Sequence, residues 1–191
     1  MREKIVNKAV DLLNEQSVHN TSFRDIAAAL GVSDGHVRYY FKTKEILLLE
    51  IFKQLDQEVL ALAHNIEPHP DLKEVIKNQL KSAFTTMVRY RFLFYEPPAS
   101  FGQFPKLQAA YKQLLHDRKT LFLSVFQELI SVGFFRKDFT PDKQEKVFYA
   151  LFVFSDSWIR YYTIMNNKAP DNKAILFHSE VAFGFLEEYI N

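Results

Sequence analysis

The chain has 191 residues, of which 48% are hydrophobic and 25% charged, proportions typical of a globular protein with one large domain or two small ones. Cysteine is absent, which excludes disulfide bonds, thiol-based redox sensing and thiolate metal sites. The formal net charge of +1 gives no general attraction to nucleic acid, so evidence for that partner has to come from local patterns.

The first residues and the apolar runs of the chain bear on its location. The opening M-R-E-K-I-V-N-K begins an amphipathic helix rather than a signal peptide. The sequence contains no uninterrupted run of about 18 apolar residues, so no membrane-spanning helix is expected. We therefore expect a cytoplasmic protein.

Hydrophobic spacing and helix-end residues predict helices along the whole chain, and no segment shows a stronger strand pattern. Prolines and glycines mark several of the helix ends. The expected helices cover residues 2–16, 23–30, a short segment capped by Ser33, 44–65, 71–94, a short segment in the broken stretch 97–105, 105–132, 140–165 and 170–190. The sequence thus predicts an all-α fold of about nine helices.

Residues 22–47 have the layout of a helix-turn-helix unit. Gly31 ends the first short helix at a point where the chain can adopt a positive φ and turn sharply. Ser33 can cap the second helix, because its hydroxyl can accept a free backbone N–H. Val37 and Phe41 can anchor that helix to the core while polar and aromatic side chains face outward, as in a recognition helix. The alternative is a plain αα-hairpin at a protein surface.

The run that follows, Y-Y-F-K-T-K-E-I-L, resembles the end of the DNA-binding domain in TetR-family transcriptional regulators. The resemblance covers residues 2 to about 52, and the window Y-R-F-L-F-Y at residues 90–95 also resembles the C-terminal domain of one branch of that family. Ser17 stands where the family often has Gly, His36 where it usually has Thr or Ser, and Arg38 where it often has Tyr. These departures do not change the expected fold, but they leave the operator sequence undetermined.

The resemblance implies two domains that meet within the long helix near Phe52. Residues 1–52 would form the helix-turn-helix domain, and residues 53–191 a helical bundle for ligand sensing and dimerisation. By position in the motif, the expected readers of base edges are Asp34, Gly35, His36, Arg38 and Tyr39. The expected phosphate contacts and helix caps are Ser22, Ser33, Tyr40, Lys42 and Lys44. Any one of these side chains could instead be merely solvated.

Aromatic residues are abundant, with 19 Phe, 9 Tyr and 1 Trp. An aromatic core explains most of them, but Tyr, Trp and Arg on apolar helix faces also suit a ligand pocket with polar groups. The family resemblance favours such an effector pocket. Its expected lining is Phe84, Met87, Tyr90, Arg91, Phe94, Phe122, Phe126, Trp158 and Tyr162.

The last two predicted helices carry more apolar surface than one chain needs to cover, which favours pairing with a second copy. The residues expected at this interface are Val147, Leu151, Phe154, Leu176, Val181 and Phe185. The alternative is that both helices only cover the pocket. A homodimer would present two recognition helices about one DNA turn apart, roughly 34 Å, and would prefer a palindromic operator in double-stranded DNA.

Catalysis has little support, because the chain lacks a nucleophile elbow, a phosphate-binding glycine loop and paired catalytic carboxylates. His64 and His69 flank the E-P segment without a further histidine nearby in sequence, so neither a metal nor another cofactor is expected. We expect a repressor released from its operator by a small apolar or aromatic effector. Two alternatives remain, namely a DNA-binding regulator controlled by a protein partner, and a helical enzyme or interaction module with a vestigial DNA-binding unit.

Overall fold

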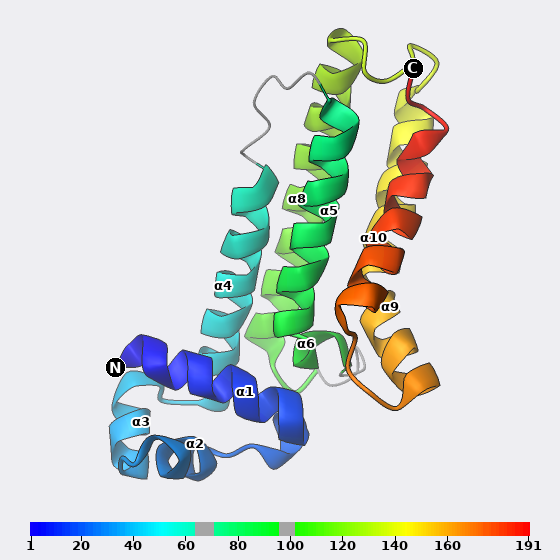
Figure 1. Cartoon of the computed structure of the whole chain (residues 1–191). Helices are drawn as coiled ribbons and strands as arrows, with labels where there is room; N and C mark the ends of the chain where they lie inside the picture. Colours follow the sequence, from blue (N-terminus) through cyan, green and yellow to red (C-terminus); the bar gives the residue numbers. More distant parts are fainter. Residues whose placement is uncertain (64–70, 96–101) are drawn as a thin grey trace. The chain divides into compact units, whose positions relative to one another are not determined.

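The computed structural model describes residues 1–63, 71–95 and 102–191 (Figure 1). Within these ranges the chain forms nine α-helices and no β-strand, which confirms the predicted all-α fold. The helices are α1 (Arg2–Asn20), α2 (Phe23–Leu30), α3 (Asp34–Tyr40), α4 (Lys44–Ala63), α5 (Leu72–Arg89), α6 (Phe92–Tyr95), α8 (Pro105–Ser131), α9 (Pro141–Asn166) and α10 (Asn172–Glu187). No helix in the described ranges is both long enough and apolar enough to cross a membrane. The pair His64 and His69, and the short helix expected after Pro97, fall outside the described residues.

The helices pack into two compact units. The N-terminal unit consists of residues 1–58 and 89–111, and the C-terminal unit of residues 59–88 and 112–191. Packing therefore groups residues 89–111 with the expected DNA-binding part of the chain. The functional boundary near Phe52 stays a prediction.

Apolar faces of the helices form the core of the N-terminal unit. Ile5 and Ala9 on α1, Val37 on α3 and Ile51 on α4 have no exposed surface, and neither has Phe41 after α3. Each fully buried large apolar side chain contributes on the order of 1.5–3 kcal/mol. The buried side chains attach one side of α3 to the core, and the opposite side of the helix faces outward.

The helix predicted over residues 71–94 is interrupted at Tyr90 and Arg91, which corrects the sequence-based boundary. In a continuous helix the N–H of Phe92 would bind the carbonyl of residue 88, and the carbonyl of Arg89 would bind the N–H of residue 93. Instead Asn14 of α1 replaces both partners. Its Oδ1 accepts from the Phe92 N–H at 3.0 Å, and its Nδ2 donates to the Arg89 carbonyl at 2.9 Å.

A second contact fixes the same break to α4. The Tyr90 hydroxyl donates to Glu58 Oε1 at 2.7 Å, and Arg89 Nη1 lies 3.2 Å from Glu58 Oε2. Tyr90 has no exposed surface. Burial, together with the adjacent Glu58 carboxylate, raises the pKa of Tyr90 well above its ordinary value. Hydrogen bonds from α1, and a hydrogen bond and an ion pair with α4, thus stabilise the break between α5 and α6.

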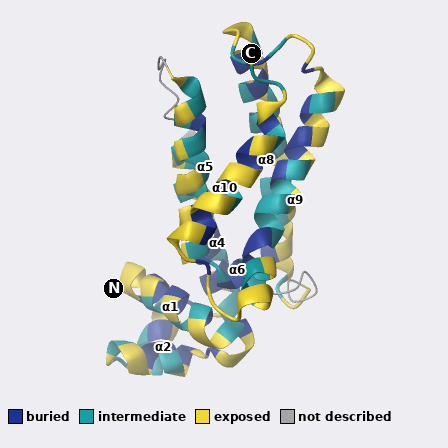
Figure 2. Cartoon of the chain, turned by 45° about the vertical axis from the view of Figure 1, so that its right-hand side comes forward, coloured by how far each residue is buried: buried dark blue, intermediate teal, exposed yellow. Residues whose placement is uncertain are grey.

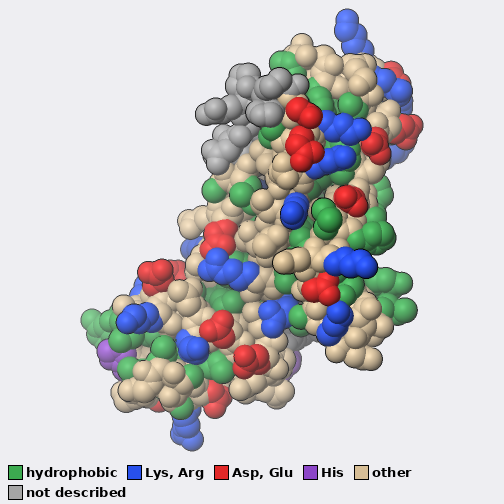
Figure 3. All heavy atoms as spheres, in the orientation of Figure 1, with side chains coloured by type: hydrophobic (Ala, Val, Ile, Leu, Met, Phe, Trp, Pro, Cys, Tyr) green, Lys and Arg blue, Asp and Glu red, His purple; other side chains and the backbone are tan. Residues whose placement is uncertain are grey.

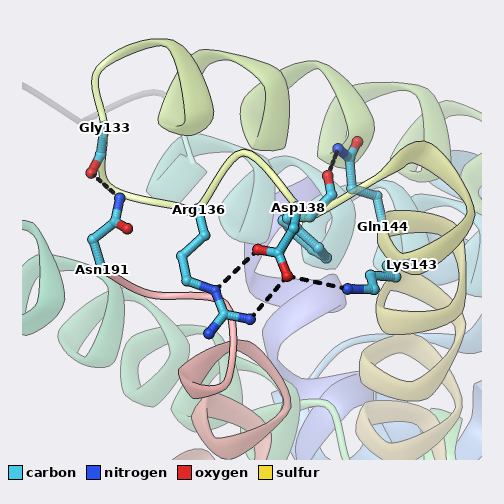
Figure 4. A network of polar contacts seen from close by, with 7 residues as sticks. Gly133, Arg136, Asp138, Lys143, Gln144 and Asn191 are labelled. Atoms are coloured by element: carbon cyan, nitrogen blue, oxygen red, sulfur yellow. Dashed lines mark hydrogen bonds and ion pairs between the residues drawn. The ribbon is translucent and has the colours of Figure 1, made fainter.

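In the C-terminal unit, the last residues of the chain bind the loop between α8 and α9. The last helix was predicted to reach Ile190 but ends at Glu187, because the following residues bind the loop between α8 and α9. The Tyr189 carbonyl accepts from the Arg136 N–H at 2.8 Å. Figure 4 shows a second bond, in which Asn191 Nδ2 donates to the Gly133 carbonyl at 2.7 Å. Arg136 in turn pairs with Asp138 at 3.0 Å. The bonds of Tyr189 and Asn191 to this loop take the place of further turns of α10.

Ser17 has a backbone conformation that suits glycine. It interrupts α1 with φ 74° and ψ 165°, a region that L-residues occupy at a cost of about 1–3 kcal/mol. The bend places the Ser17 carbonyl where it accepts from the Thr21 hydroxyl at 2.9 Å. The frequent Gly at this position in the resembling family therefore has a physical reason.

We predict that Ser17→Gly stabilises the protein by about 1 kcal/mol, because the relief of strain exceeds the entropy that glycine adds to the unfolded chain. The melting temperature should rise by about 2–4 °C for a protein of this size. Asn167→Gly is the matched control, since Asn167 has φ 52° and ψ 30°, which asparagine tolerates. A melting temperature that is unchanged or lower in Ser17→Gly would show that this residue carries no strain.

Candidate DNA-binding site

Two caps and a glycine turn shape the helix-turn-helix. The Ser22 hydroxyl accepts from the Asp25 N–H at 3.3 Å, while Asp25 Oδ2 accepts from the Ser22 N–H at 2.7 Å, which completes a capping box. Hydrogen bonds from the Ser22 hydroxyl and N–H hold the pKa of Asp25 below its usual range. Gly31 adopts φ 66°, and the following Val32 N–H binds the Ala27 carbonyl at 3.0 Å. The turn therefore ends α2 and directs the chain into α3.

The candidate recognition helix α3 has two distinct sides. Val37 on this helix and Phe41 after it are fully buried, whereas Tyr39 is 73% exposed and Arg38 is also exposed. Tyr40 is half-buried, and its ring contacts His36 and Tyr39 edge to face at centroid distances of 5.5 and 5.2 Å. The outer side thus presents a guanidinium and aromatic rings, which can bind base edges and the sugar-phosphate backbone.

Arg38 is held by two neighbours. Its Nε donates to Asp34 Oδ2 at 2.6 Å, one helical turn earlier. Its guanidinium carbon lies 5.2 Å from the centre of the Phe23 ring on α2. The spacing of Asp34 and Arg38, four residues apart on a helix, is a sequence signal for this pair. The role of Phe23 could not be read from spacing, since it depends on how α2 packs against α3.

Some of the expected DNA contacts also have partners within the chain. Ser33 caps α3, because its hydroxyl accepts from the His36 N–H at 3.2 Å. Lys44 Nζ donates to the Val18 carbonyl at 2.6 Å, so this lysine ties the end of α1 to the start of α4. Lys42 and Gly35 are exposed on the described surface. Of the two lysines, Lys42 is the one whose position leaves it available to a phosphate group.

Figure 3 shows acidic and basic side chains interspersed over the visible face, without one large patch of a single sign. This distribution agrees with the net charge of +1. Any affinity of the N-terminal unit for DNA would therefore depend on local contacts around α3 more than on a general positive potential.

The residues expected to line an effector pocket fall into separate groups. Tyr90, Arg91 and Phe94 belong to the N-terminal unit, and the other six belong to the C-terminal unit. Phe84 of α5 and Trp158 of α9 stack with ring centres 5.3 Å apart, and Met87 is half-buried on α5. Phe122 and Phe126 contact each other at 6.0 Å in a second aromatic cluster, which includes Phe148.

His178 of α10 belongs to the aromatic cluster that contains Phe84 and Trp158. The sequence analysis did not predict this residue. Its ring stacks on Trp158 at 4.6 Å and meets Tyr162 edge to face at 5.9 Å. Its Nδ1 lies 2.8 Å from the Ala174 carbonyl. The indole Nε1 of Trp158 is buried and has no hydrogen-bond partner among the described residues. A lone histidine on an apolar helix face gave only a weak sequence signal for this position.

The residues expected at a dimer interface differ in exposure. Val147 and Leu151 are buried within the protomer, and Phe154 packs between Phe84 and Phe185. Leu176 and Val181 are exposed by 44% and 37%. Further large apolar residues are exposed on the same two helices, namely Tyr149, Val153, Tyr161, Ile164, Met165 and Phe177.

Comparison with known proteins decides the family. Residues 5–51 match the family model described as bacterial regulatory proteins of the tetR family. Residues 54–182, more than half of the chain, match the TetR model described as a bacterial transcriptional repressor. The chain belongs to the TetR family. Its members are transcriptional regulators and not enzymes.

Similar proteins agree with this assignment. The chain is 28% identical over 85 residues to the fatty acid metabolism regulator protein of Bacillus subtilis, and 31% identical over 90 residues to the transcriptional regulator AcrR of Shigella flexneri. These matches span 44% of this chain in both cases, and only 44% and 42% of the two relatives.

Solved structures share the fold over nearly the whole chain. A TetR-family regulator from Marinobacter aquaeolei has a TM-score of 0.85 at 19% identity, over 100% of this chain and 91% of that one. The fatty acid degradation regulator FadR from Bacillus halodurans has a TM-score of 0.72 at 18% identity, over 96% and 94%. At these identities the likeness establishes the fold of this TetR-family chain.

Proposed function

We propose that this TetR-family chain binds a specific operator in double-stranded DNA through α3 and represses the adjacent genes. The observation that carries the proposal is the two-sided placement of α3. Val37 and Phe41 fix the helix to the core, while Arg38 and Tyr39 project outward. An enzyme or interaction module with a vestigial DNA-binding unit would have no need for this outward-facing set.

The proposal predicts different effects for two cationic residues. Arg38→Ala should reduce affinity for the selected operator by about 1–3 kcal/mol and relax the choice of base at one position. Lys42→Ala should weaken binding to operator and random DNA alike, and should lower the slope of log K against log salt by about one unit.

The measurement combines selection of bound sequences from a random DNA pool with titrations on the recovered operator and on random DNA. Failure of the wild-type protein to enrich any sequence would contradict the proposed function. Equal losses on operator and random DNA for Arg38→Ala would instead make this residue a phosphate contact.

We further propose that a second copy of the chain covers the exposed apolar face of α9 and α10. The two helices pack side by side, and α10 shows a largely exposed outer face in Figure 2. Hydrophobic side chains also lie along the edge formed by these helices in Figure 3. Val153, Ile164 and Phe177 are 62%, 68% and 59% exposed, so their burial would be a strong driving force for pairing. Val147 and Leu151, which are buried within the protomer, would pack beneath the residues of this interface.

We predict that Phe177→Glu converts a dimer into a monomer. In a symmetric interface each residue is buried twice, so the loss should be about 3–6 kcal/mol and should raise the dissociation constant by more than about 100-fold. Val132→Glu is the matched control, because Val132 is 68% exposed but lies outside α9 and α10. Sedimentation at micromolar concentrations should show a dimer for the wild type and the control. A wild-type monomer would contradict the interface.

A two-fold symmetric dimer would place two copies of α3 on one face of the DNA, about one helical turn apart. The preferred operator is therefore expected to be a palindrome or near-palindrome.

We also propose that the C-terminal unit senses a small apolar or aromatic effector. The supporting observation is Trp158, which is 2% exposed and whose indole Nε1 lacks a partner among the described residues. An unpaired buried N–H costs about 1–3 kcal/mol, which an acceptor on a bound effector would offset. Two of the similar proteins are named as regulators of fatty acid metabolism or degradation, so fatty acids are the first probes, followed by simple aromatic acids.

If the effector releases the DNA, the coupling has to be reciprocal. We predict that saturating operator DNA weakens effector binding by about 5- to 150-fold, the range that corresponds to a coupling of 1–3 kcal/mol. Trp158, the single tryptophan of the chain, reports effector binding by its fluorescence. Identical affinities with and without operator would exclude release by that compound. If no probe binds while DNA recognition persists, a regulator controlled by a protein partner becomes the better description.

A further inference from the structure

The guanidinium group of Arg38 is restrained from two directions before any DNA is bound. Asp34 Oδ2 accepts from Arg38 Nε at 2.6 Å, and the Phe23 ring lies 5.2 Å below the guanidinium carbon. Asp34 and Arg38 lie on α3, whereas Phe23 is a buried residue of α2. An exposed arginine ordinarily loses much rotamer freedom when it binds a target. In this chain the side chain of Arg38 has already lost part of its rotamer freedom in the free protein.

The bond to Asp34 also determines which N–H groups of Arg38 remain available. The guanidinium has five N–H donors, and the one on Nε points to Asp34. The Nη1 and Nη2 groups remain as a fork. A guanine offers two acceptors, O6 and N7, at a matching separation in the major groove. The arrangement therefore leaves free the pair of donors that suits guanine.

The carboxylate of Asp34 is poorly placed to read a base itself. Its Oδ2 is already bound to Arg38, and its Oδ1 is buried without a partner in the described part of the chain. A carboxylate that reads cytosine needs an acceptor oxygen facing the base. An exposed pair spaced i, i+4 also contributes little to stability. A negative charge near phosphate groups would weaken DNA binding unless it has another role.

We propose that Asp34 is a positioning residue for DNA recognition, which orients Arg38 to read one guanine in the operator. The proposal rests on the proposed function of α3 as a recognition helix. It departs from the sequence-based expectation that Asp34 contacts a base directly.

A double-mutant cycle tests this role. Wild type, Asp34→Ala, Arg38→Ala and the double variant are titrated with the selected operator, with the operators mutated at each single base pair, and with random DNA. Arg38→Ala should lose about 5- to 150-fold of discrimination at one G·C pair. Asp34→Ala should lose most of the same discrimination at the same pair, without weaker binding to random DNA. In the Arg38→Ala background, Asp34→Ala should have no further effect on discrimination.

Two further variants control for charge and folding. Asp11→Ala removes an exposed acid of α1 that pairs with Lys8, so it tests the loss of one negative charge from the same unit. It should leave base discrimination unchanged. Asp34→Asn keeps an acceptor for Arg38 Nε and should retain part of the discrimination. It also replaces Asp34→Ala in the cycle if that variant fails to fold.

Three results would overturn the proposal while leaving the proposed function intact. Asp34→Ala could alter preference at a different base pair, which would make Asp34 a reader in its own right. The effects of Asp34→Ala and Arg38→Ala could add independently. Discrimination could also stay at the wild-type level in Asp34→Ala, which would reduce the pair to a surface salt bridge. Absence of any preferred sequence for the wild type would overturn the proposed function and this inference together.

Discussion

One asparagine side chain sets the arrangement of the N-terminal unit. Asn14 supplies an acceptor to the Phe92 N–H and a donor to the Arg89 carbonyl, so the break between α5 and α6 leaves neither backbone group without a partner. The same break is fixed to α4 by the bonds from Tyr90 and Arg89 to Glu58. Arg89, which belongs to the N-terminal unit, is thus bonded directly to both α1 and α4.

This connection matters for the proposed regulation. A ligand can shift the equilibrium between two shapes only by its different affinity for them, so the two shapes have to differ at defined contacts. The Asn14 and Glu58 contacts join Arg89 to both α1 and α4, and α4 begins a few residues after the candidate recognition helix α3. A change in the position of Arg89 would therefore act on hydrogen bonds with specific geometry. Such bonds are either made or broken, which suits a two-state switch.

The sequence predicted most helices because their ends are set locally. Gly31 and Ser33 act on the backbone within a few residues of themselves, and the structure shows the expected turn and capping bond at both. The missed boundaries have distant causes. The helical pattern through residues 90–94 is real, but Asn14 interrupts it from 75 or more residues away. Likewise, the loop around Arg136 ends α10 before Ile190.

In the candidate sites, too, features with local causes could be predicted from the sequence, and features that depend on distant residues could not. The spacing of Val37 and Phe41 was enough to predict which side of α3 is buried. It was not enough to predict which aromatic rings meet, because helical periodicity assigns a face but not its partner. Phe154 was expected at an interface between copies, yet it also packs between Phe84 and Phe185. His178 was missed because its environment is formed by side chains of α9 as well as of α10.

The two-sided construction of α3 also bears on how such a protein can evolve. The buried Val37 and Phe41 maintain the unit, whereas the exposed side chains can change with little loss of stability. Under the proposed function, substitutions at Asp34, Arg38 or Tyr39 would therefore alter the preferred operator while the scaffold persists. The TM-score of 0.85 at 19% identity with the Marinobacter regulator shows how far sequences with this fold can diverge. After gene duplication, a copy of this chain could acquire a new target through a few surface changes in a single short helix.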